Sequence, residues 1–253
     1  MEKSVQKKVV IIIIVAYILI SLLLVLFSGY STPKFVVFND DVYEYKDSNF
    51  IKQEDYIKKT PIELYVENNY EGKFSFIYDD EDEEVTFYQG KKVYNKTGAN
   101  YFAVTKNINV DIINYEKEQM DNDDMLILNQ VLTNLSVTNY EMLGTSEKIK
   151  FDYDNDNEEE TIYFVSNLFL ESENDKVFNL VYTIDDGKIK YLEKQVNAMN
   201  QFYDSCTSSL FAITDFEKDG NYEYIIECSY FDKIGSEYNI YNYENNKFKL
   251  INK

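Results

Sequence analysis

Histidine, tryptophan and arginine are absent from this chain of 253 residues, so each of its 25 basic residues is a lysine. Without histidine there is no imidazole base, no Ser-His or Cys-His catalytic pair and no imidazole metal ligand. The sequence also lacks a glycine-rich phosphate loop, a nucleophile elbow and zinc-type cysteine spacing. Any functional site must therefore consist of carboxylates, amides, hydroxyls, lysine and tyrosine.

Positive charge is scarce as well, and the net charge is −20. The first 28 residues hold three lysines and one glutamate, so the rest of the chain carries 22 lysines, 44 acidic residues and a net charge of −22. Such a surface repels phosphate backbones, and we expect no nucleic acid as a partner. Cations or basic partners suit this charge, although an acidic surface also simply keeps an exported protein soluble.

One long apolar run is present, Val9 to Phe27, with 19 uncharged residues. As a helix it would extend about 28 Å, close to the thickness of a bilayer core. The lysines before it predict a cytoplasmic tail (1–8), a single transmembrane helix (9–28) in the cell membrane and an extracytoplasmic C-terminal domain. A cleaved signal peptide is the alternative, because Gly29 and Ser31 resemble a small-residue cleavage site.

After this run the chain is typical of β-strands. Short segments rich in Tyr, Phe, Ile and Val alternate with Asn, Asp and Gly clusters. The strands expected in the N-terminal half are Lys34–Phe38, Ile62–Val66, Lys73–Tyr78, Glu84–Tyr88, Tyr101–Thr105 and Asn109–Tyr115. Residues 121–135 differ, because acidic residues are followed by apolar residues at helical spacing, which predicts a short connecting helix.

The C-terminal half contains an internal repeat with a period of 63 residues. Residues 147–167 align with residues 210–229, each as an apolar strand, an acidic loop and a second strand. Residues 178–193 align with residues 238–251, each as two strands joined by a tight turn, at Asp186-Gly187 or at Asn245-Asn246. Residues 74–88 resemble a shorter copy.

Four strands per unit fit a propeller blade or a stacked four-stranded antiparallel sheet. We therefore expect an all-β extracytoplasmic domain, with a β-rich half that includes the helical connector (29–143) and the β repeats with acidic loops (144–253).

The acidic loops 152–160 and 215–223 place oxygen ligands at relative positions 1, 3, 5, 7 and 9. Calcium takes six to eight oxygen ligands, and alternate carboxylates plus a backbone carbonyl in a tight loop supply that arrangement. The expected ligands are Asp152, Asp154, Asp156, the carbonyl of Glu158 and Glu160 in the first loop, and Asp215, Glu217, Asp219, the carbonyl of Asn221 and Glu223 in the second. Position 6 holds Asn157 or Gly220, the residue types that best tolerate a left-handed backbone. The alternative is that both loops are solvated acidic turns.

An EF-hand is excluded, because its bidentate Glu at position 12 is replaced by Tyr163 and Ile226 and the flanks are strand-like. The loops instead resemble the calcium loops of FG-GAP and VCBS repeats, in which Asp-x-Asp-x-Asp-Gly-x-x-Asp/Glu lies between two strands. This resemblance covers residues 147–253 and implies calcium as the cofactor. Asn157 stands in place of the usual Gly, and Glu217 in place of Asp or Asn.

Cys206 and Cys228 bracket the second loop, and outside the cytoplasm they are candidates for a disulfide. If Thr214 pairs with Tyr224, Cys228 faces Leu210, and Cys206 must fold back through a turn to reach it. The alternative is two buried thiols.

The sequence therefore favours a membrane-anchored bacterial surface protein with a calcium-stabilised β domain that binds an unknown protein or glycan partner, or that has a structural role. No catalytic residue stands out, because 45 acidic residues make chance carboxylate pairs inevitable. The alternatives are an exported hydrolase with a carboxylate pair and an accessory subunit of a membrane complex.

Overall fold

A computed structural model describes residues 32–96, 98–137, 140–142, 144, 146–154, 156–169, 176–198, 206–230 and 235–252. From Lys34 onward the chain forms one compact unit, Lys34–Lys253. The predicted cytoplasmic tail (1–8) and transmembrane helix (9–28) lie outside the described residues. Within the described part, no helix is long and apolar enough to span a membrane.

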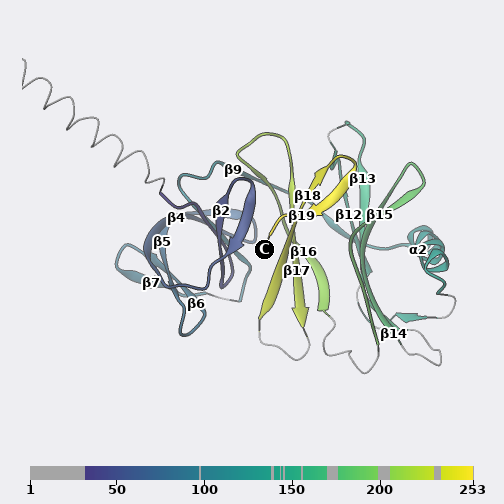
Figure 1. Cartoon of the computed structure of the whole chain (residues 1–253), viewed down its shortest axis with the longest axis horizontal. Helices are drawn as coiled ribbons and strands as arrows, with labels where there is room; N and C mark the ends of the chain where they lie inside the picture. Colours follow the sequence, from purple (N-terminus) through teal and green to yellow (C-terminus); the bar gives the residue numbers. More distant parts are fainter. Residues whose placement is uncertain are drawn as a thin grey trace, which may run out of the picture. The chain divides into compact units, whose positions relative to one another are not determined.

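The expectation of a mostly β architecture is confirmed. The described residues form three sheets with antiparallel pairing throughout their strands, and a single α-helix. We call the sheets the N-terminal sheet, the first repeat sheet and the second repeat sheet. In Figure 1 the N-terminal sheet, the second repeat sheet, the first repeat sheet and α2 follow one another across the view.

The N-terminal sheet has eight strands in the order β3-β2-β1-β8-β4-β5-β6-β7. They are β1 (Phe35–Phe38), β2 (Asp41–Lys46), β3 (Asn49–Lys52), β4 (Ile57–Val66), β5 (Asn69–Asp79), β6 (Glu84–Gln89), β7 (Lys92–Tyr94) and β8 (Tyr101–Thr105). Residues 74–88, expected as a strand, a short acidic loop and a strand, form most of the β5–β6 hairpin in this sheet.

The first repeat sheet has the strand order β10-β12-β13-β14-β15, and β11 also pairs with β13. Its strands are β10 (Lys117–Gln119), β11 (Glu141–Met142), β12 (Ser146–Phe151), β13 (Glu160–Phe169), β14 (Lys176–Asp185) and β15 (Lys188–Ala198). The second repeat sheet has the order β19-β18-β17-β16-β9. Its strands are β9 (Val110–Ile113), β16 (Cys206–Phe216), β17 (Glu223–Tyr230), β18 (Ser236–Glu244) and β19 (Lys247–Leu250).

The two repeats therefore build equivalent four-stranded antiparallel units. Short strands that precede residue 144 extend them, β10 and β11 in the first unit and β9 in the second. The tight turns expected in both units are confirmed. Asp186 and Gly187 have φ angles of 50° and 69°, and Asn245 and Asn246 have φ angles of 52° and 65°. Two left-handed residues in a row give the backbone twist that a two-residue hairpin needs.

Both faces of the repeat sheets carry buried side chains, which alternate between the two faces along each strand. On β13, Ile162 and Phe164 pack in a cluster with residues of the second repeat sheet. Tyr163 and Val165, on the opposite face, pack against α2. The first repeat sheet is thus covered on both faces, as continuous apolar runs require.

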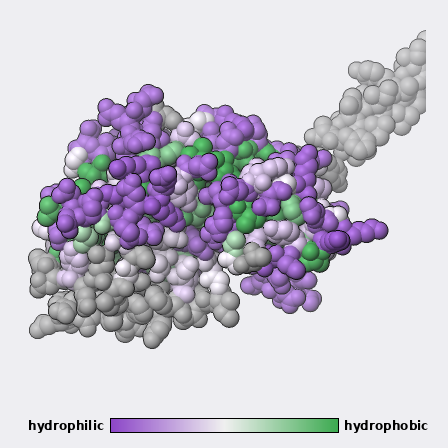
Figure 2. All heavy atoms as spheres, turned by 180° about the vertical axis from the view of Figure 1, so that it is seen from behind, coloured by the Kyte–Doolittle hydropathy of each residue, from purple (hydrophilic) through white to green (hydrophobic). Residues whose placement is uncertain are grey.

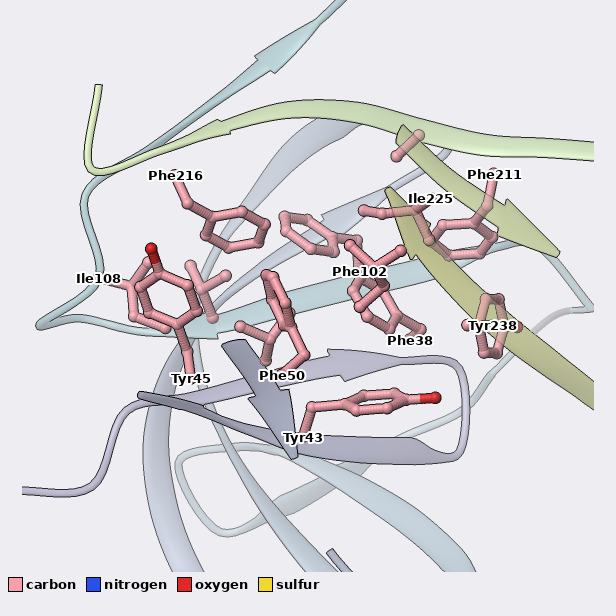
Figure 3. Packing of buried hydrophobic residues seen from close by; sticks show 14 of the residues in the cluster. Phe38, Tyr43, Tyr45, Phe50, Phe102, Ile108, Phe211, Phe216, Ile225 and Tyr238 are labelled. Carbon is pink, nitrogen blue, oxygen red and sulfur yellow. The ribbon is translucent and has the colours of Figure 1, made fainter. Parts of the chain in front are cut away.

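The N-terminal sheet packs on the second repeat sheet through a largely aromatic cluster, shown in Figure 3. Phe38 contacts Phe211 and Tyr238, with ring centroids 5.7 and 5.4 Å apart. Phe50 contacts Phe216 at 5.0 Å. Edge-to-face and tilted ring pairs of this kind stabilise a core beyond the area that they bury. The abundant aromatic residues are therefore used largely for sheet-to-sheet packing.

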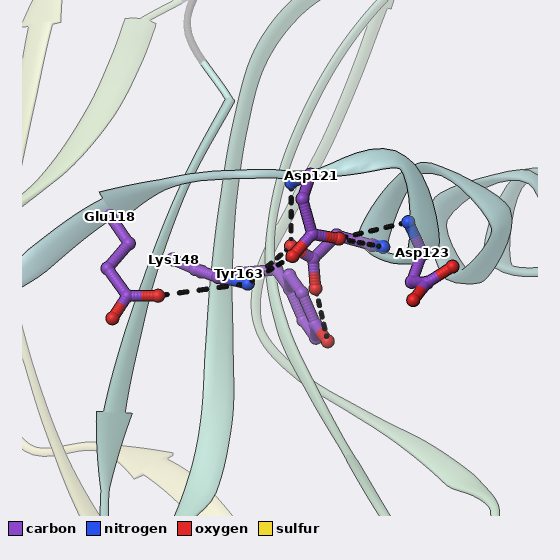
Figure 4. Close-up of polar contacts among 6 residues, drawn as sticks. Glu118, Asp121, Asp123, Lys148 and Tyr163 are labelled. Carbon is purple, nitrogen blue, oxygen red and sulfur yellow. Dashed lines mark hydrogen bonds and ion pairs between the residues drawn. The ribbon is translucent and has the colours of Figure 1, made fainter.

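The predicted connecting helix is confirmed as α2 (Asn122–Asn134). Asp121 is its N-cap and forms a reciprocal capping box with Asp124. The buried Lys148 of β12 donates hydrogen bonds to Asp124 Oδ2 (2.6 Å) and Asp121 Oδ2 (3.2 Å), and Tyr163 donates to Asp124 Oδ1 at 3.3 Å (Figure 4). The Asp124 N–H and then Lys148 lower the pKa of Asp121 to about 2. Charged hydrogen bonds thus attach the start of the helix to the first repeat sheet.

Candidate calcium loops

Loop 1 (residues 152–160) and loop 2 (residues 215–223) occupy equivalent places in the two repeats. Loop 1 joins β12 to β13, and loop 2 joins β16 to β17, in each case between two antiparallel neighbours. The strand flanks predicted from the sequence are therefore confirmed.

Two aspartates organise the backbone of loop 1. Asp152, at position 1, accepts hydrogen bonds from the N–H groups of Asp156 (3.2 Å) and Asn157 (3.0 Å). Asp156, at position 5, accepts the N–H of Glu158 at 2.8 Å. Asn157 has a φ of 71°, as expected for the residue at the sharp turn.

Loop 2 repeats this arrangement atom for atom. Asp215 accepts the N–H groups of Asp219 (3.0 Å) and Gly220 (3.1 Å), and Asp219 accepts the N–H of Asn221 at 2.9 Å. Gly220 has a φ of 83°. Equivalent aspartates thus hold both turns. The spacing of these aspartates therefore serves the turn and does not simply reflect the high content of acidic residues.

The glutamate at position 9 closes each loop in the same way. Glu160 accepts the N–H of Tyr153 at 3.2 Å, and Glu223 accepts the N–H of Phe216 at 3.0 Å. Burial first, and then the aspartates of each loop, raise the pKa of both carboxyls, in total to about 8 for Glu223. Each position-9 carboxyl therefore lies in an environment that penalises uncompensated negative charge.

Loop 1 also gathers three of its predicted ligands. Asp152, Asp154 and Asp156 each place a carboxylate oxygen within 4.8 Å of the others. Burial and the neighbouring Asp156 raise the pKa of Asp154. Carboxylates this close repel one another, and a divalent cation bound between them would remove that repulsion. The donor set is of the kind that calcium prefers, and Glu160 and the Glu158 carbonyl belong to the same turn.

Loop 2 gathers its side chains less well. Glu217, at position 3, forms an ion pair with Lys34, and Lys218 forms one with Asp111. Both loop residues have a left-handed backbone, with φ angles of 70° and 54°. Among the described residues, the loop 2 acids form no group of three with ligand atoms as close as those in loop 1. Loop 1 is therefore the better fit for a cation.

The surroundings of loop 1 contain residues that sequence reasoning did not identify. The Tyr153 ring, 2% exposed, contacts Tyr243 at 4.6 Å and Phe248 at 5.2 Å, both on the second repeat sheet. The Phe151 ring contacts Tyr222 of loop 2 at 4.9 Å. The only sequence signal was the general abundance of tyrosine. Loop 1 thus lies against the other repeat instead of extending freely into solvent.

Cys206 and Cys228 form a disulfide between β16 and β17, with Cα atoms 5.2 Å apart. The expectation that Cys206 must fold back through a turn is wrong. Thr214 pairs with Glu223, and a register shift between Leu210 and Ala212 follows. Cys228 consequently lies opposite Ser208, so Cys206 is its diagonal neighbour on a continuous strand.

A buried carboxyl lies between the two repeat sheets. Glu193 of β15, 5% exposed, accepts hydrogen bonds from Ser208, from Asn239 (2.7 Å) and from Tyr241 (3.4 Å), all on the second repeat sheet. Burial raises its pKa, and the three donors oppose that shift. Because it is enclosed by the two sheets, Glu193 connects them and has no access to a substrate.

Comparison with known proteins gives no relative: the chain matches no protein-family model, no curated protein and no solved structure.

Proposed function

We propose that this chain is a membrane-anchored bacterial surface protein whose extracytoplasmic β domain is stabilised by calcium in loop 1 and acts as a binding or structural module. The observation that carries the proposal is the cluster of Asp152, Asp154 and Asp156 within 4.8 Å. The anchor rests on the apolar run Val9 to Phe27, which predicts a transmembrane helix over residues 9–28 and would place the loops where calcium is plentiful.

The effect of calcium would be to hold one turn and, through it, the junction of the two repeats. Asp152 and Asp156 already bind the loop backbone, and Tyr153 packs on Tyr243 and Phe248. A cation that neutralises the aspartates would stabilise this loop conformation relative to the unfolded chain. At ten times its dissociation constant, one bound ion adds about 1.4 kcal/mol to the free energy of unfolding.

Thermal unfolding of the full chain in detergent tests this proposal, with tyrosine fluorescence as the signal. We expect millimolar calcium to raise the melting temperature by about 3–6 °C relative to chelator, given about 2–4 °C per kcal/mol for a domain of this size. Asp154→Asn should remove most of this increase. Glu159→Gln removes the same charge from a non-ligand position of the same loop and should retain it. Identical melting curves in calcium and chelator would contradict the proposal.

A further inference from the structure

A cavity of about 930 Å³ opens where the turns of the N-terminal sheet meet the β17–β18 end of the second repeat sheet. Its walls come from the β1–β2 and β5–β6 turns, the end of β3, the chain before β8, and the residues around Tyr230 and Ser236. This volume is in the range of small-molecule sites. None of the described loop 1 or loop 2 residues lines it, so it is separate from the candidate calcium loops.

Negative charge dominates the cavity wall. Among the described residues that line it, six acids stand against two lysines, Lys52 and Lys96, which leaves these residues with a formal charge of −4. The acids are Asp40, Asp41, Glu54, Asp80, Glu83 and Glu237. A concave acidic surface concentrates cations at its opening.

The acids are spread over several segments instead of meeting at one point. In the part of the chain that the structure describes, the one group of three acids with ligand atoms within 4.8 Å is in loop 1 and not in this cavity. A single metal ion needs converging oxygens, whereas a ligand with several separated positive groups does not. The distribution therefore favours an extended cation.

Two carboxylates of the cavity wall already pair with the ammonium groups of lysines in the same wall. Lys52 Nζ lies 2.8 Å from Asp41 Oδ1, and Lys96 pairs with Asp40. The other oxygen of Asp41, Oδ2, is buried and accepts no hydrogen bond from any described residue. Glu54, Asp80 and Glu83 take part in no ion pair within the described ranges. Carboxylates thus remain for further ammonium groups.

Four tyrosines contribute to the wall, three of them through a small exposed part of the side chain. Tyr78, Tyr101 and Tyr238 line the cavity with 6%, 2% and 3% exposure, and Tyr230 lies beside Glu237, to which its hydroxyl donates at 2.8 Å. Aromatic faces bind both aliphatic chains and cations.

The aromatic part of the wall is held in place before any ligand binds. Asn39 Nδ2 donates to the Tyr238 hydroxyl at 2.6 Å, and Asn39 Oδ1 accepts the Tyr101 N–H at 2.8 Å. A preformed wall lowers the entropic cost of binding.

We propose that this cavity binds an extended organic cation, with two or more primary ammonium groups on an aliphatic stem. The ammonium groups pair with carboxylates on different walls, and the stem contacts the exposed parts of the tyrosine side chains. A free polyamine and the lysine side chains of a peptide share this chemistry. The site goes beyond the calcium proposal and does not depend on it.

Isothermal titration calorimetry of the full chain in detergent at physiological ionic strength tests this inference. Two probes, spermidine and the amide of acetylated trilysine, distinguish a free polyamine from lysine side chains, and binding of either supports the site. The double variant Asp80→Asn/Glu83→Gln should weaken binding about tenfold, which corresponds to two partly exposed ion pairs.

Glu81→Gln/Asp82→Asn is the matched control, because it removes the same charge from the same turn at positions that do not line the cavity. All four positions are exposed, so both double variants should have the same melting temperature as the wild type. Titrations in calcium and in chelator should agree, which separates this site from loop 1. Binding of neither probe, or equal weakening in the control variant, would overturn the inference.

Discussion

The hydroxyl of Tyr224, in the second repeat sheet, donates a hydrogen bond to the backbone carbonyl of Tyr153, in loop 1, at 3.4 Å. Tyr224 is fully buried, and it directly follows Glu223, the last residue of loop 2. The start of loop 1 is thus hydrogen-bonded to β17, the strand that follows loop 2. Together with the Phe151–Tyr222 ring contact, this bond connects the two equivalent loops of the repeats.

Removing this hydroxyl should weaken the contact between loop 1 and the second repeat sheet and leave the packing of the ring in place. Tyr224→Phe keeps the ring and loses one hydrogen bond, so we expect the free energy of unfolding to fall by about 1 kcal/mol. The melting temperature should fall by about 2–4 °C. Tyr222→Phe is the control, since that half-buried side chain contacts Phe151 through its ring. If both variants melted with the wild type, the bond would have no role in stability.

Replacing Lys148 should be far more damaging. Lys148→Met leaves the buried Asp124 carboxylate without its cation, and breaking a buried ion pair in this way costs about 3–5 kcal/mol. Lys150→Met, on the same strand but exposed, should change stability by less than about 0.5 kcal/mol. Denaturant unfolding of both variants gives the comparison, and similar midpoints would show that the ion pair does not attach α2.

Glu193 should make stability depend on pH. Burial raises its pKa, so above the unfolded value of about 4.3 the folded state holds the proton more tightly than the unfolded state. The free energy of unfolding therefore falls as pH rises from that value through the raised folded pKa. Glu193→Gln removes this contribution, so the variant should become more stable relative to the wild type as pH rises.

Urea unfolding between pH 5 and pH 8 measures this difference, because this range of about three pH units lies above the unfolded pKa. Glu116→Gln replaces an exposed acid, so its free energy of unfolding should change with pH in the same way as that of the wild type. A Glu193→Gln profile that also ran parallel to the wild type would contradict the assignment.

Reducing the Cys206–Cys228 disulfide should destabilise the second repeat. The bond closes a segment with a sequence separation of 22 residues, and chain-entropy arguments give about 3 kcal/mol for a loop of this size. Denaturant midpoints with and without reductant measure the loss. The Cys206→Ala/Cys228→Ala variant should resemble the reduced wild type and should not respond to reductant. Equal wild-type midpoints with and without reductant would contradict this prediction.

Local signals in the sequence were sufficient for several elements. Acidic residues before an apolar helical pattern located α2, and the structure shows that Asp121, the first residue of the expected segment, is its N-cap. Asp186-Gly187 and Asn245-Asn246 located two hairpin turns because these residue types accept positive φ. The spacing of loop 1 placed Asp152, Asp154 and Asp156 close together, since alternate residues of a tight turn share one side.

Such local signals could not predict which strands pair when the strands are far apart in the sequence. Nothing local indicates that β8 inserts between β1 and β4, because this order depends on packing across the whole N-terminal sheet. The register shift after Leu210 moved Cys228 opposite Ser208, and a one-residue bulge leaves no clear trace in an apolar strand. Lys148 resembled any other surface lysine until its buried carboxylate partner was known.

Calcium titration by calorimetry tests the central claim most directly. The full chain in detergent should bind calcium, and Asp154→Asn/Asp156→Asn should abolish binding at loop 1, whereas Asp219→Asn in loop 2 should leave it intact. Wild-type chain that gave no binding heat in millimolar calcium, or an Asp154→Asn/Asp156→Asn variant that bound as well as the wild type, would contradict the account.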